Sequence, residues 1–434
     1  MNPRKLVKKL IPATLFRKIE PYGHLAEAVL MQTLNGFPTK GLKVIGVTGT
    51  NGKTSTSFLI QRMLHEAGYK VGLMTTVGYG VGADIKPQIQ HMTTASSGLL
   101  LRRIKAMRAE GMEWLVLETT SHGLAQHRVW GIPYSIAVMT NVTHEHLDYH
   151  GTFERYRDAK RLLFKQTNRN RSGLRAGVIN AEDPSAKLFA ADISRALTYG
   201  LKEGDIRAEN VSLKPNAVSY TAKFKEQSYE IKCHLPGSFN IANSLAAVCV
   251  GSLLGLSKAQ IESGIAALEG VEGRMMSIVE GQKFNVIIDF AHTPDSFEKL
   301  FKDLRPAVKG KLLVLFGSAG RRDEEKRAVQ GSLAGKYADE VVITEEDDRD
   351  IDGVKIMNQI ATGAESKGKT RDKDLFLVHD RTEAISFIFS RAKPGDTVLL
   401  LGKGHEKTIE RADGSHPWNE MSVARKALQH YVAN

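Results

Sequence analysis

The chain has 434 residues, too many for a single hydrophobic core of ordinary size, and this length predicts two or three domains. Hydrophobic residues make up 42% and charged residues 25%, proportions typical of a soluble globular protein. The net charge of +12 favours a protein that handles anions such as nucleotide phosphates and carboxylates. Nucleic acid is not expected as a partner, because the basic residues are scattered and no aromatic-rich binding motif accompanies them.

The two cysteines, Cys233 and Cys249, lie in apolar or strand-like surroundings and lack the spacing of a metal site. We interpret them as reduced core thiols, which predicts a reducing compartment, the cytoplasm. No apolar run reaches transmembrane length.

Residues 1–41 form a basic N-terminal segment in which charges alternate with apolar side chains. Pro12 and the charges interrupt the apolar stretch that a signal peptide would need. Two interpretations stay open: the segment lies on an anionic face at the inner side of the membrane, or it forms a helix packed on its own protein. Its basic residues are Arg4, Lys5, Lys8, Lys9, Arg17 and Lys18.

Three short apolar strands are predicted in the first part of the chain, at 42–47, 114–118 and 135–140. Strands that alternate with helical patterns predict βαβ units and a parallel sheet. Ligands of such sheets bind at the carboxyl ends of the strands. The Gly-rich turn after the first strand, Glu118 and Asn141 are therefore expected at one site.

A second α/β series begins after a boundary predicted near 268–273. Before it, 205–233 is expected to add short alternating strands, followed by a helix at about 241–254. The strands of the second series are predicted at 285–289, 311–316, 340–344 and 397–401. We predict an α/β fold with a P-loop ATPase-type parallel-sheet central domain, 42–268, and a Rossmann-like α/β C-terminal domain, 269–434.

The strongest local signal is the octapeptide TGTNGKTS at 48–55, which follows a strand and opens a helix. In this context backbone N–H groups cradle phosphates, Lys53 reaches the β- and γ-phosphates, and the Thr54 hydroxyl binds Mg²⁺. Val47 stands where the generic pattern has Gly, with Gly46 one place early. The motif still predicts a nucleotide site, formed by Gly49, Thr50, Asn51, Gly52, Lys53, Thr54 and Ser55.

Acidic and histidine side chains follow the next two strands. Glu118 closes one strand, where its carboxylate can bind Mg²⁺ directly or through water. The following strand is succeeded by His144, Glu145, His146, Asp148 and His150. A single histidine is more often structural, but a cluster at a strand end of a nucleotide-binding domain favours a functional site.

These residues resemble the Mur ligases of peptidoglycan synthesis, most closely the E type, which adds the third amino acid to UDP-N-acetylmuramoyl-L-alanyl-D-glutamate. The resemblance runs from about Leu42 to Leu428. Its motifs stand in family order: VTGTNGKTST, ETTSHGLAQHRV, TNVTHEHLDYHGTFERYRDAKRLLF, LPGSFNIANSLAA, GVEGRM, IIDFAHTPDS, GSAGRRDEEKR and GKGHE. It implies a cytoplasmic, ATP-dependent amide ligase of cell-wall biogenesis, which serves cell shape and cell division.

The resemblance also implies a role for each matching position. Catalytic roles fall to Lys53, Glu118, His146 and Lys160. Two Mg²⁺ ions would be held by Thr54, Glu118, His146 and Lys160, the last as a carbamate, which turns a cation into an anionic oxygen ligand. Nucleotide contacts fall to the phosphate loop and to Asn141, Asn240, Asn243, Arg274, Asp289 and His292. The muramyl peptide would be gripped by Thr93, Thr94, Thr120, Ser121, Gln126 and Arg128, with Thr120 where the family usually has Ser.

Two departures qualify the resemblance. Residues 1–41 are too few for the uridine-binding N-terminal domain of the family, so either the UDP moiety is held differently or the substrate is not a UDP-sugar. The hypothesis for the second case is a shortened or lipid-linked muramyl peptide, with the basic segment at the membrane. The loop that selects the amino acid reads Glu-Asp-Asp-Arg at 346–349, where relatives that add meso-diaminopimelate carry Asp-Asn-Pro-Arg.

This loop still favours a diamino acid, diaminopimelate before lysine. Arg349 is expected to clamp a distal carboxylate, and Asp347 in place of Asn adds a negative charge that favours an amine. Arg322, Gly402 and Glu406 keep the positions expected from the family.

The implied mechanism transfers the γ-phosphoryl group of ATP to the acceptor carboxylate, after which the incoming amine displaces phosphate. The C-terminal domain is expected to close over the first and exclude water, and the protein is expected to be a monomer. Folylpolyglutamate synthases share this architecture and lack the uridine domain, but TTSHG, HLDYHGT and GKGHE favour the muramyl type. A catalytically silent nucleotide-binding scaffold is the other alternative, against which the intact Lys53, Glu118 and Lys160 argue.

Overall fold

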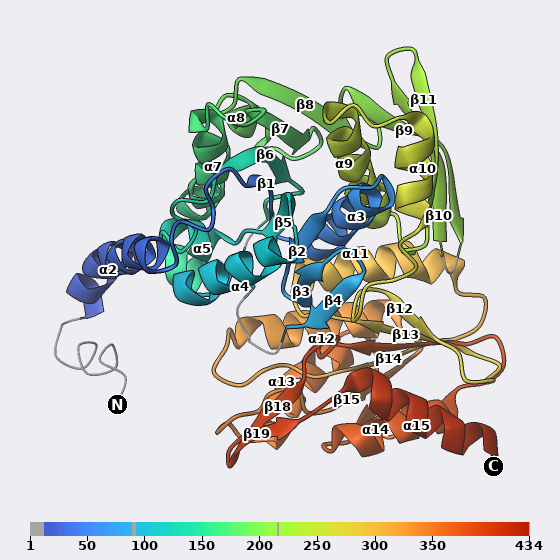
Figure 1. The fold of residues 1–434 in the computed structure, drawn as a ribbon. Helices are drawn as coiled ribbons and strands as arrows, with labels where there is room; N and C mark the ends of the chain where they lie inside the picture. Colours follow the sequence, from blue (N-terminus) through green and yellow to red (C-terminus); the bar gives the residue numbers. More distant parts are fainter. Residues whose placement is uncertain (1–12, 89–92, 144, 215–216, 434) are drawn as a thin grey trace. The chain divides into compact units, whose positions relative to one another are not determined.

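The structure is a computed structural model that describes residues 13–88, 93–143, 145–214 and 217–433. The chain divides into two compact units, and each is described by itself (Figure 1). Unit 1 comprises Met1–Val211, Ser219–Cys233 and Asn240–Leu268; unit 2 comprises Ser212–Val218, His234–Phe239 and Glu269–Asn434. The predicted basic residues Arg4, Lys5, Lys8 and Lys9 and the predicted site residue His144 lie outside the described residues.

An eleven-stranded sheet forms the centre of unit 1, in the order β11-β10-β9-β8-β7-β6-β1-β5-β2-β3-β4. Its middle strands β1 (Lys43–Thr48), β5 (Trp114–Glu118) and β6 (Tyr134–Met139) run parallel and are buried apart from Lys43. Val47 pairs with both Glu118 and Val138, so the three strands end side by side. The segments that follow them therefore share the carboxyl end of the sheet.

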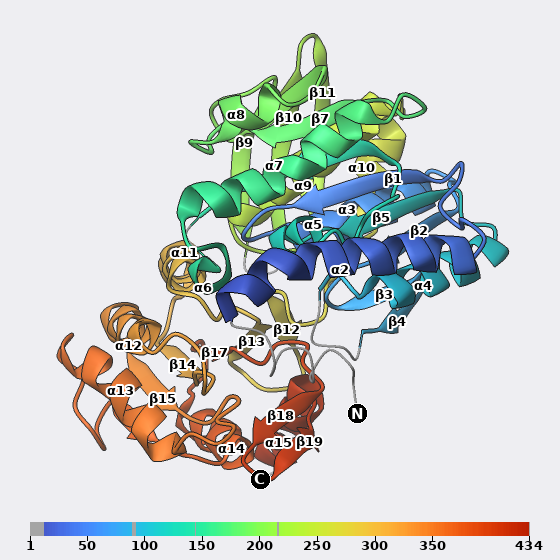
Figure 2. The ribbon, with the colours of Figure 1, turned by 90° about the vertical axis from the view of Figure 1, so that its left-hand side faces the viewer.

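Helices cover both faces of this sheet. α3 packs on β1, β2 and β5 and is covered in turn by α10, whereas α4 and α7 contribute to one shared apolar core. Figure 2 shows α2 running across the near side of the unit, and α2 packs against α4. The helices of unit 1 are α2 (Ala13–Leu34), α3 (Lys53–Glu66), α4 (Ser97–Ala109), α5 (Ser121–Ala125), α6 (Leu147–His150), α7 (Phe153–Arg169), α8 (Ala186–Ala190), α9 (Phe239–Leu253) and α10 (Lys258–Ala266). Its other strands are β2 (Val71–Met74), β3 (Gly78–Val81), β4 (Asp84–Pro87), β7 (Ala176–Asn180), β8 (Arg195–Gly200), β9 (Ile206–Lys214), β10 (Ala217–Phe224) and β11 (Gln227–Cys233).

Unit 2 contains a six-stranded sheet in the order β12-β13-β17-β14-β15-β16, parallel except for β12. Apolar cores lie on both of its faces, as expected of a parallel sheet flanked by helices. The strands are β12 (Met276–Ile278), β13 (Asn285–Asp289), β14 (Leu312–Phe316), β15 (Glu340–Ile343), β16 (Leu375–Leu377) and β17 (Thr397–Leu401), with a separate hairpin of β18 (Thr408–Arg411) and β19 (Gly414–Pro417). The helices are α11 (Pro294–Leu304), η1 (Arg305–Ala307), α12 (Glu325–Tyr337), α13 (Gly353–Glu365), α14 (Arg381–Arg391) and α15 (Glu420–Ala433).

The predicted α/β fold class is confirmed. The seven predicted sheet strands that flank the site motifs are present with ends within one residue of those expected, because each is a continuous apolar run bounded by turn residues. The division into domains at 42–268 and 269–434 stays a prediction. None of the described helices is long and apolar enough to cross a membrane.

Candidate functional site

The phosphate loop connects the end of β1 to the start of α3. Gly52 adopts φ +82, a left-handed conformation that glycine tolerates, and a Cβ there would collide with the Asn243 amide. The loop is clamped by Asn141, which follows β6: Thr50 N–H donates to the Asn141 carbonyl (2.7 Å) and Asn51 N–H to its side-chain oxygen (3.0 Å). The Asn141 amide donates back to the Asn51 carbonyl at 3.0 Å, so the loop is held as the parallel-sheet rule predicts.

Two lysine side chains donate hydrogen bonds to backbone carbonyl oxygens of this loop. The Lys53 ammonium donates to the Thr50 carbonyl at 2.8 Å, and the Lys160 ammonium, from α7, donates to the Gly49 carbonyl at 2.6 Å. Lys160 is buried, and this burial together with the nearby Lys53 charge holds its pKa well below its ordinary value. A depressed pKa raises the fraction of neutral, nucleophilic amine at neutral pH.

Oxygen ligands gather at the end of β5. The buried Glu118 carboxylate accepts from the Thr54 hydroxyl at 3.0 Å and from the backbone N–H and hydroxyl of Thr76 at 3.0 and 3.1 Å. A hydroxyl and a carboxylate that already touch, beside a phosphate loop, form the donor set that suits Mg²⁺. The residues present therefore fit one such ion.

His146 lies in a group of aromatic rings beside the loop. Its ring centroid is 4.7 Å from that of His122 and 6.0 Å from that of Tyr156, and Tyr156 in turn lies 4.5 Å from the Lys160 ammonium. The Tyr156 hydroxyl is 2.9 Å from that of Thr50. Burial raises the pKa of Tyr156 far above its usual range, so this hydroxyl stays protonated. His146 and Lys160 thus both lie near the Tyr156 ring.

The residues expected to grip the acceptor form a connected network on the other side of Glu118. The Thr94 hydroxyl donates to the Glu118 carbonyl (3.2 Å), receives the Thr120 N–H (2.9 Å) and lies 3.0 Å from the Thr120 hydroxyl. The Thr120 side chain also caps α5 by accepting from Gly123 N–H, a task that the family's usual serine would perform equally well. The Arg128 guanidinium donates to the Thr94 carbonyl.

The other predicted acceptor residues lie around this network. Ser121 is buried in α5, and its hydroxyl lies 3.1 Å from Nε2 of His150. The Thr93 hydroxyl lies 2.9 Å from the Thr76 hydroxyl. Gln126 is the C-cap residue of α5. The network therefore shares Thr76 and Glu118 with the predicted Mg²⁺ site.

The two predicted adenine-binding asparagines lie on α9. The Asn243 amide donates to the Asn240 side-chain oxygen at 2.8 Å, and the Thr56 hydroxyl donates to Asn243 at 3.3 Å. Both amides are buried, and the Asn243 amide adjoins the phosphate loop at Gly52.

Unit 2 holds the remaining predicted residues. Asp289 ends β13, and its carboxylate accepts from Met275 N–H at 2.7 Å and from Ala291 N–H at 2.8 Å. Burial raises its pKa despite the nearby Arg274, whose guanidinium lies 4.9 Å from the Phe290 ring. His292 Nδ1 is 2.8 Å from the Phe290 carbonyl, so these predicted nucleotide residues cluster at one strand end.

The predicted amino-acid loop after β15 contains a buried ion-pair group. The ammonium of Lys403, fully buried, lies 2.8 Å from Asp347 and 2.7 Å from Glu406, and Glu410 N–H also donates to Asp347 at 3.0 Å. Burial alone lowers the pKa of Lys403, but the Glu406 and Asp347 carboxylates raise it on balance. Burial raises the pKa of Glu406. A Cβ at Gly402 would lie 2.6 Å from the Glu346 carboxylate, so glycine at this position leaves room for that side chain.

Arg349 is held beside this group in a left-handed conformation, φ +58. Its N–H donates to the Glu410 carbonyl at 2.9 Å and its guanidinium to the Gly320 carbonyl at 2.7 Å. Arg322 is exposed on the segment that precedes α12. The structure thus brings together Asp347, Arg349, Gly402 and Glu406, and sequence reasoning missed Lys403, which the GKGHE motif contains.

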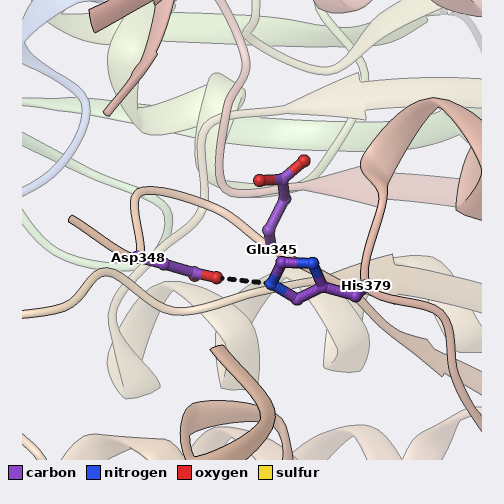
Figure 3. Close-up of side chains that lie close together, drawn as sticks. All are labelled: Glu345, Asp348 and His379. Carbon is purple, nitrogen blue, oxygen red and sulfur yellow. Dashed lines mark hydrogen bonds and ion pairs between the residues drawn. The ribbon is translucent and has the colours of Figure 1, made fainter. Parts of the chain in front are cut away.

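Sequence reasoning also missed a second acidic group of the same loop. Among the described residues, Glu345, Asp348 and His379 place possible metal ligands within 4.8 Å of one another. Figure 3 shows the Asp348 carboxylate pointing at the His379 ring, to which it lies 2.8 Å away. Glu345 is already engaged by the Arg411 guanidinium at 2.6 and 2.9 Å, so the group is largely neutralised by its own neighbours. We therefore assign it a structural role in shaping the loop.

Comparison with known proteins agrees with this geometry. The family model of the Mur ligase middle domain matches residues 47–251, and that of the Mur ligase glutamate ligase domain matches 273–404. A Roseiflexus protein called UDP-N-acetylmuramyl-tripeptide synthetase is 39% identical, over 94% of this chain and 82% of its own length. A solved UDP-N-acetylmuramoyl-L-alanyl-D-glutamate–2,6-diaminopimelate ligase shares 29% identity with a TM-score of 0.65, over 95% of this chain and 83% of its own. The folylpolyglutamate synthase of Mycobacterium tuberculosis superposes with a TM-score of 0.72 over 94% of this chain and 95% of its own, but at 16% identity it shares the fold alone.

The fold and the nucleotide site define an ATP-dependent ligase of the kind that joins an acid to an amino acid and forms ADP. The chain belongs to the Mur ligase family, whose members build peptidoglycan precursors.

Proposed function

We propose that this ligase adds a diamino acid, diaminopimelate before lysine, to the terminal carboxylate of UDP-N-acetylmuramoyl-L-alanyl-D-glutamate. The observation that carries the proposal is the shared use of Glu118: its carboxylate holds Thr54 of the phosphate loop, and its carbonyl holds Thr94 of the predicted acceptor network. A carboxylate gripped there lies next to the nucleotide site. The names of the tripeptide synthetase and diaminopimelate ligase relatives support the same acceptor and product.

The reaction follows from what the residues can hold. A carboxylate oxygen of the acceptor attacks the γ-phosphorus of ATP, the bond to the β-phosphate oxygen breaks, and ADP leaves. The amine of the amino acid then attacks the carbonyl carbon, phosphate leaves, and the amine proton passes to phosphate or solvent. Lys53 and the loop N–H groups bind the crowded phosphate oxygens, while Thr94, Thr120 and Arg128 orient the carboxylate.

Two Mg²⁺ ions are part of the proposal. Thr54 and Glu118 would hold one ion, and His146 with a carbamylated Lys160 would hold the second; bound Mg²⁺ supplies charge neutralisation for the phosphate oxygens. Carbamylation forms a bond between the Lys160 nitrogen and the carbon of CO₂ and releases one proton. The depressed pKa of Lys160 supports it, because only the neutral amine reacts.

The nucleotide would also be bound by residues of α9 and of unit 2. Asn240 and Asn243 would contact adenine, since the buried Asn243 amide adjoins the phosphate loop and is hydrogen-bonded to Asn240. Arg274, Asp289 and His292 would meet the phosphates or ribose from their strand end.

For the amino acid, Arg349 would clamp the distal carboxylate, with Arg322, Gly402 and Glu406 around it. Asp347 would act through Lys403, because its carboxylate is already paired with that ammonium. We further propose a monomer that contacts the membrane peripherally through its basic N-terminal segment.

The test is phosphate release from ATP and Mg²⁺ with UDP-muramoyl-dipeptide and a panel of amino acids, with product masses measured. We expect turnover with diaminopimelate and less with lysine. Turnover only with a lipid-linked muramyl dipeptide would show that the acceptor is lipid-linked and not UDP-linked. Turnover only with folate and glutamate would support the folylpolyglutamate alternative. Nucleotide binding with no turnover on any acceptor would favour a silent scaffold.

A further inference from the structure

The first described helix, α2, carries an apolar face that no other described part of the chain covers. Tyr22 is 71% exposed, Leu30 53% and Leu34 67%, and Ala26 and Val29 are exposed beside them. Their spacing follows the helical period, so these five side chains form one continuous surface, which we name the α2 stripe. Every exposed residue of α2 after Pro21 is uncharged: Tyr22, Gly23, Ala26, Val29, Leu30, Thr33 and Leu34.

The opposite face of the same helix is firmly attached to unit 1. Ala28 and Gln32 are buried, and the Gln32 amide donates to the Thr39 hydroxyl at 3.1 Å. Met31 packs against the apolar core to which α4 contributes. Figure 1 shows α2 projecting from the unit beside α4. The α2 stripe is therefore the outward face of an anchored helix, and its exposure does not come from a detached one.

Positive charge precedes the α2 stripe in the sequence. Residues 1–19 contain six Lys or Arg residues and no Asp or Glu. The nearest acids, Glu20 and Glu27, are only partly exposed and lie 3.9 and 3.7 Å from the ring of His24, off the α2 stripe. A strongly basic segment thus leads directly into an uncovered apolar helix face.

We propose that the α2 stripe is a docking surface for an anionic lipid bilayer. An amphipathic helix lies in the membrane interface when its apolar face enters the acyl boundary and nearby Lys and Arg residues meet anionic headgroups. Both parts are present here, contiguous in the chain. A second copy of the chain is a poorer occupant, because its own N-terminal segment is equally basic and offers no anionic partner for these charges.

The inference is independent of the ligase chemistry, since the α2 stripe contains none of the nucleotide, acceptor or amino-acid residues described above. It places the enzyme at the surface where peptidoglycan precursors meet lipid, while leaving turnover of soluble substrates unchanged. Failure of the proposed ligase activity would not alter the expected lipid binding, and the two can be tested separately.

The experiment is flotation of the full-length chain with vesicles of phosphatidylcholine, with and without phosphatidylglycerol. We expect flotation only with phosphatidylglycerol and its loss at high salt, because the cations precede the stripe. The double variant Leu30→Ser/Leu34→Ser should lower the partition coefficient about tenfold or more, since two exposed apolar side chains are removed from the lipid contact. Leu30→Ala/Leu34→Ala, which preserves helix propensity, should weaken binding in the same direction.

The matched control is Val211→Ser/Leu213→Ser on β9, where the side chains are 45% and 50% exposed and close together. It should float like the natural chain, and circular dichroism and phosphate release should be the same for all variants. Equal flotation of both Leu30/Leu34 double variants and the control would overturn the proposal. Equal binding to vesicles with and without phosphatidylglycerol would also overturn it, as would self-association without lipid that the Leu30→Ser/Leu34→Ser variant abolishes.

Discussion

The phosphate loop of unit 1 and the acidic loop of unit 2 both concentrate charge, but they balance it in different ways. At the phosphate loop, the Lys53 ammonium donates to the carbonyl oxygen of Thr50, a dipole that cannot neutralise a full charge. At the acidic loop, Asp347 and Glu406 share the buried Lys403 ammonium. The phosphate loop therefore keeps positive charge available for a ligand, whereas the charges of the acidic loop neutralise one another within the protein.

This difference predicts where function and stability separate. When a cation is removed from the phosphate-binding site, the protein should lose activity and keep its fold. A buried ion-pair group should lose stability when one partner is removed, because the remaining charge stays buried without compensation. Substitutions of equal size at the two loops therefore test the comparison directly.

The largest effect is expected for Lys53→Met. Removal of the ammonium should lower kcat by at least about a hundredfold, because the charge that develops on the transferring phosphoryl group loses its stabilisation. The melting temperature should change little, since the lost contact is a single bond to the Thr50 carbonyl of the same loop. Amino-acid-dependent phosphate release and thermal melting measure the two quantities. A drop in melting temperature as large as that of a core substitution would contradict the expectation that Lys53 serves activity and not stability.

Lys403→Met is expected to act on stability. Two buried carboxylates lose their shared cation, and the expected cost to the free energy of unfolding of unit 2 is about 3 to 5 kcal/mol. Hydrogen exchange, read separately over peptides of units 1 and 2, localises the change. The double variant Lys403→Met/Asp347→Asn should recover part of the loss, since it removes one of the uncompensated charges.

The control for this variant is Lys299→Met, whose ammonium pairs with Asp295 at 3.0 Å on a partly exposed helix face. An ion pair of that kind contributes little, so exchange in unit 2 should stay close to that of the natural chain. Protection that falls equally in both lysine variants would show that burial is not what distinguishes Lys403.

These contrasts also show how far the sequence alone could lead. The strands, the phosphate loop and the meeting of Asn141 with that loop follow from apolar runs and from the rule that parallel strands present their carboxyl ends together. The pairing of Asp347 with Lys403 could not be found this way. The two residues are far apart in the chain, and which buried acid meets which buried base depends on how loops pack.

The same limit applies to α2. A basic segment with alternating apolar residues left membrane contact and internal packing both open. The structure shows that one face of the helix packs on unit 1 through Gln32 and Met31, whereas the α2 stripe stays exposed. Internal packing of one face therefore leaves another face available for the membrane contact that we propose. Which apolar side chains of α2 remain exposed depends on its packing partners, among them α4, which the sequence does not reveal.

Arg349→Ala should produce an intermediate effect on the amino acid. If the guanidinium clamps a distal carboxylate, its loss should raise the KM for diaminopimelate about tenfold to a hundredfold with a smaller change in kcat. Arg349→Lys should recover only part of this affinity, because a lysine cannot form the two parallel bonds of a guanidinium. Initial rates at varied amino-acid concentration give both constants. Arg371→Ala, which removes an exposed pair with Glu365, is the control.

The smallest effect is expected for Asp347→Asn, which restores the residue that diaminopimelate-adding relatives carry. Seen in the sequence, the extra charge favours an amine in the substrate. In the structure, however, the Asp347 carboxylate accepts from Lys403 at 2.8 Å and from Glu410 N–H at 3.0 Å, so its charge is already balanced. An asparagine oxygen can accept both bonds, and Glu406 remains to pair with Lys403.

The KM ratio between diaminopimelate and lysine should therefore change by less than about tenfold in Asp347→Asn, which corresponds to less than 1.4 kcal/mol of discrimination. Competition between the two amino acids, with product masses counted, measures this ratio directly. A larger change would mean that Asp347 faces the substrate amine. The acidic loop would then keep a charge available for its ligand, as the phosphate loop does, and the two loops would not differ in how they balance charge.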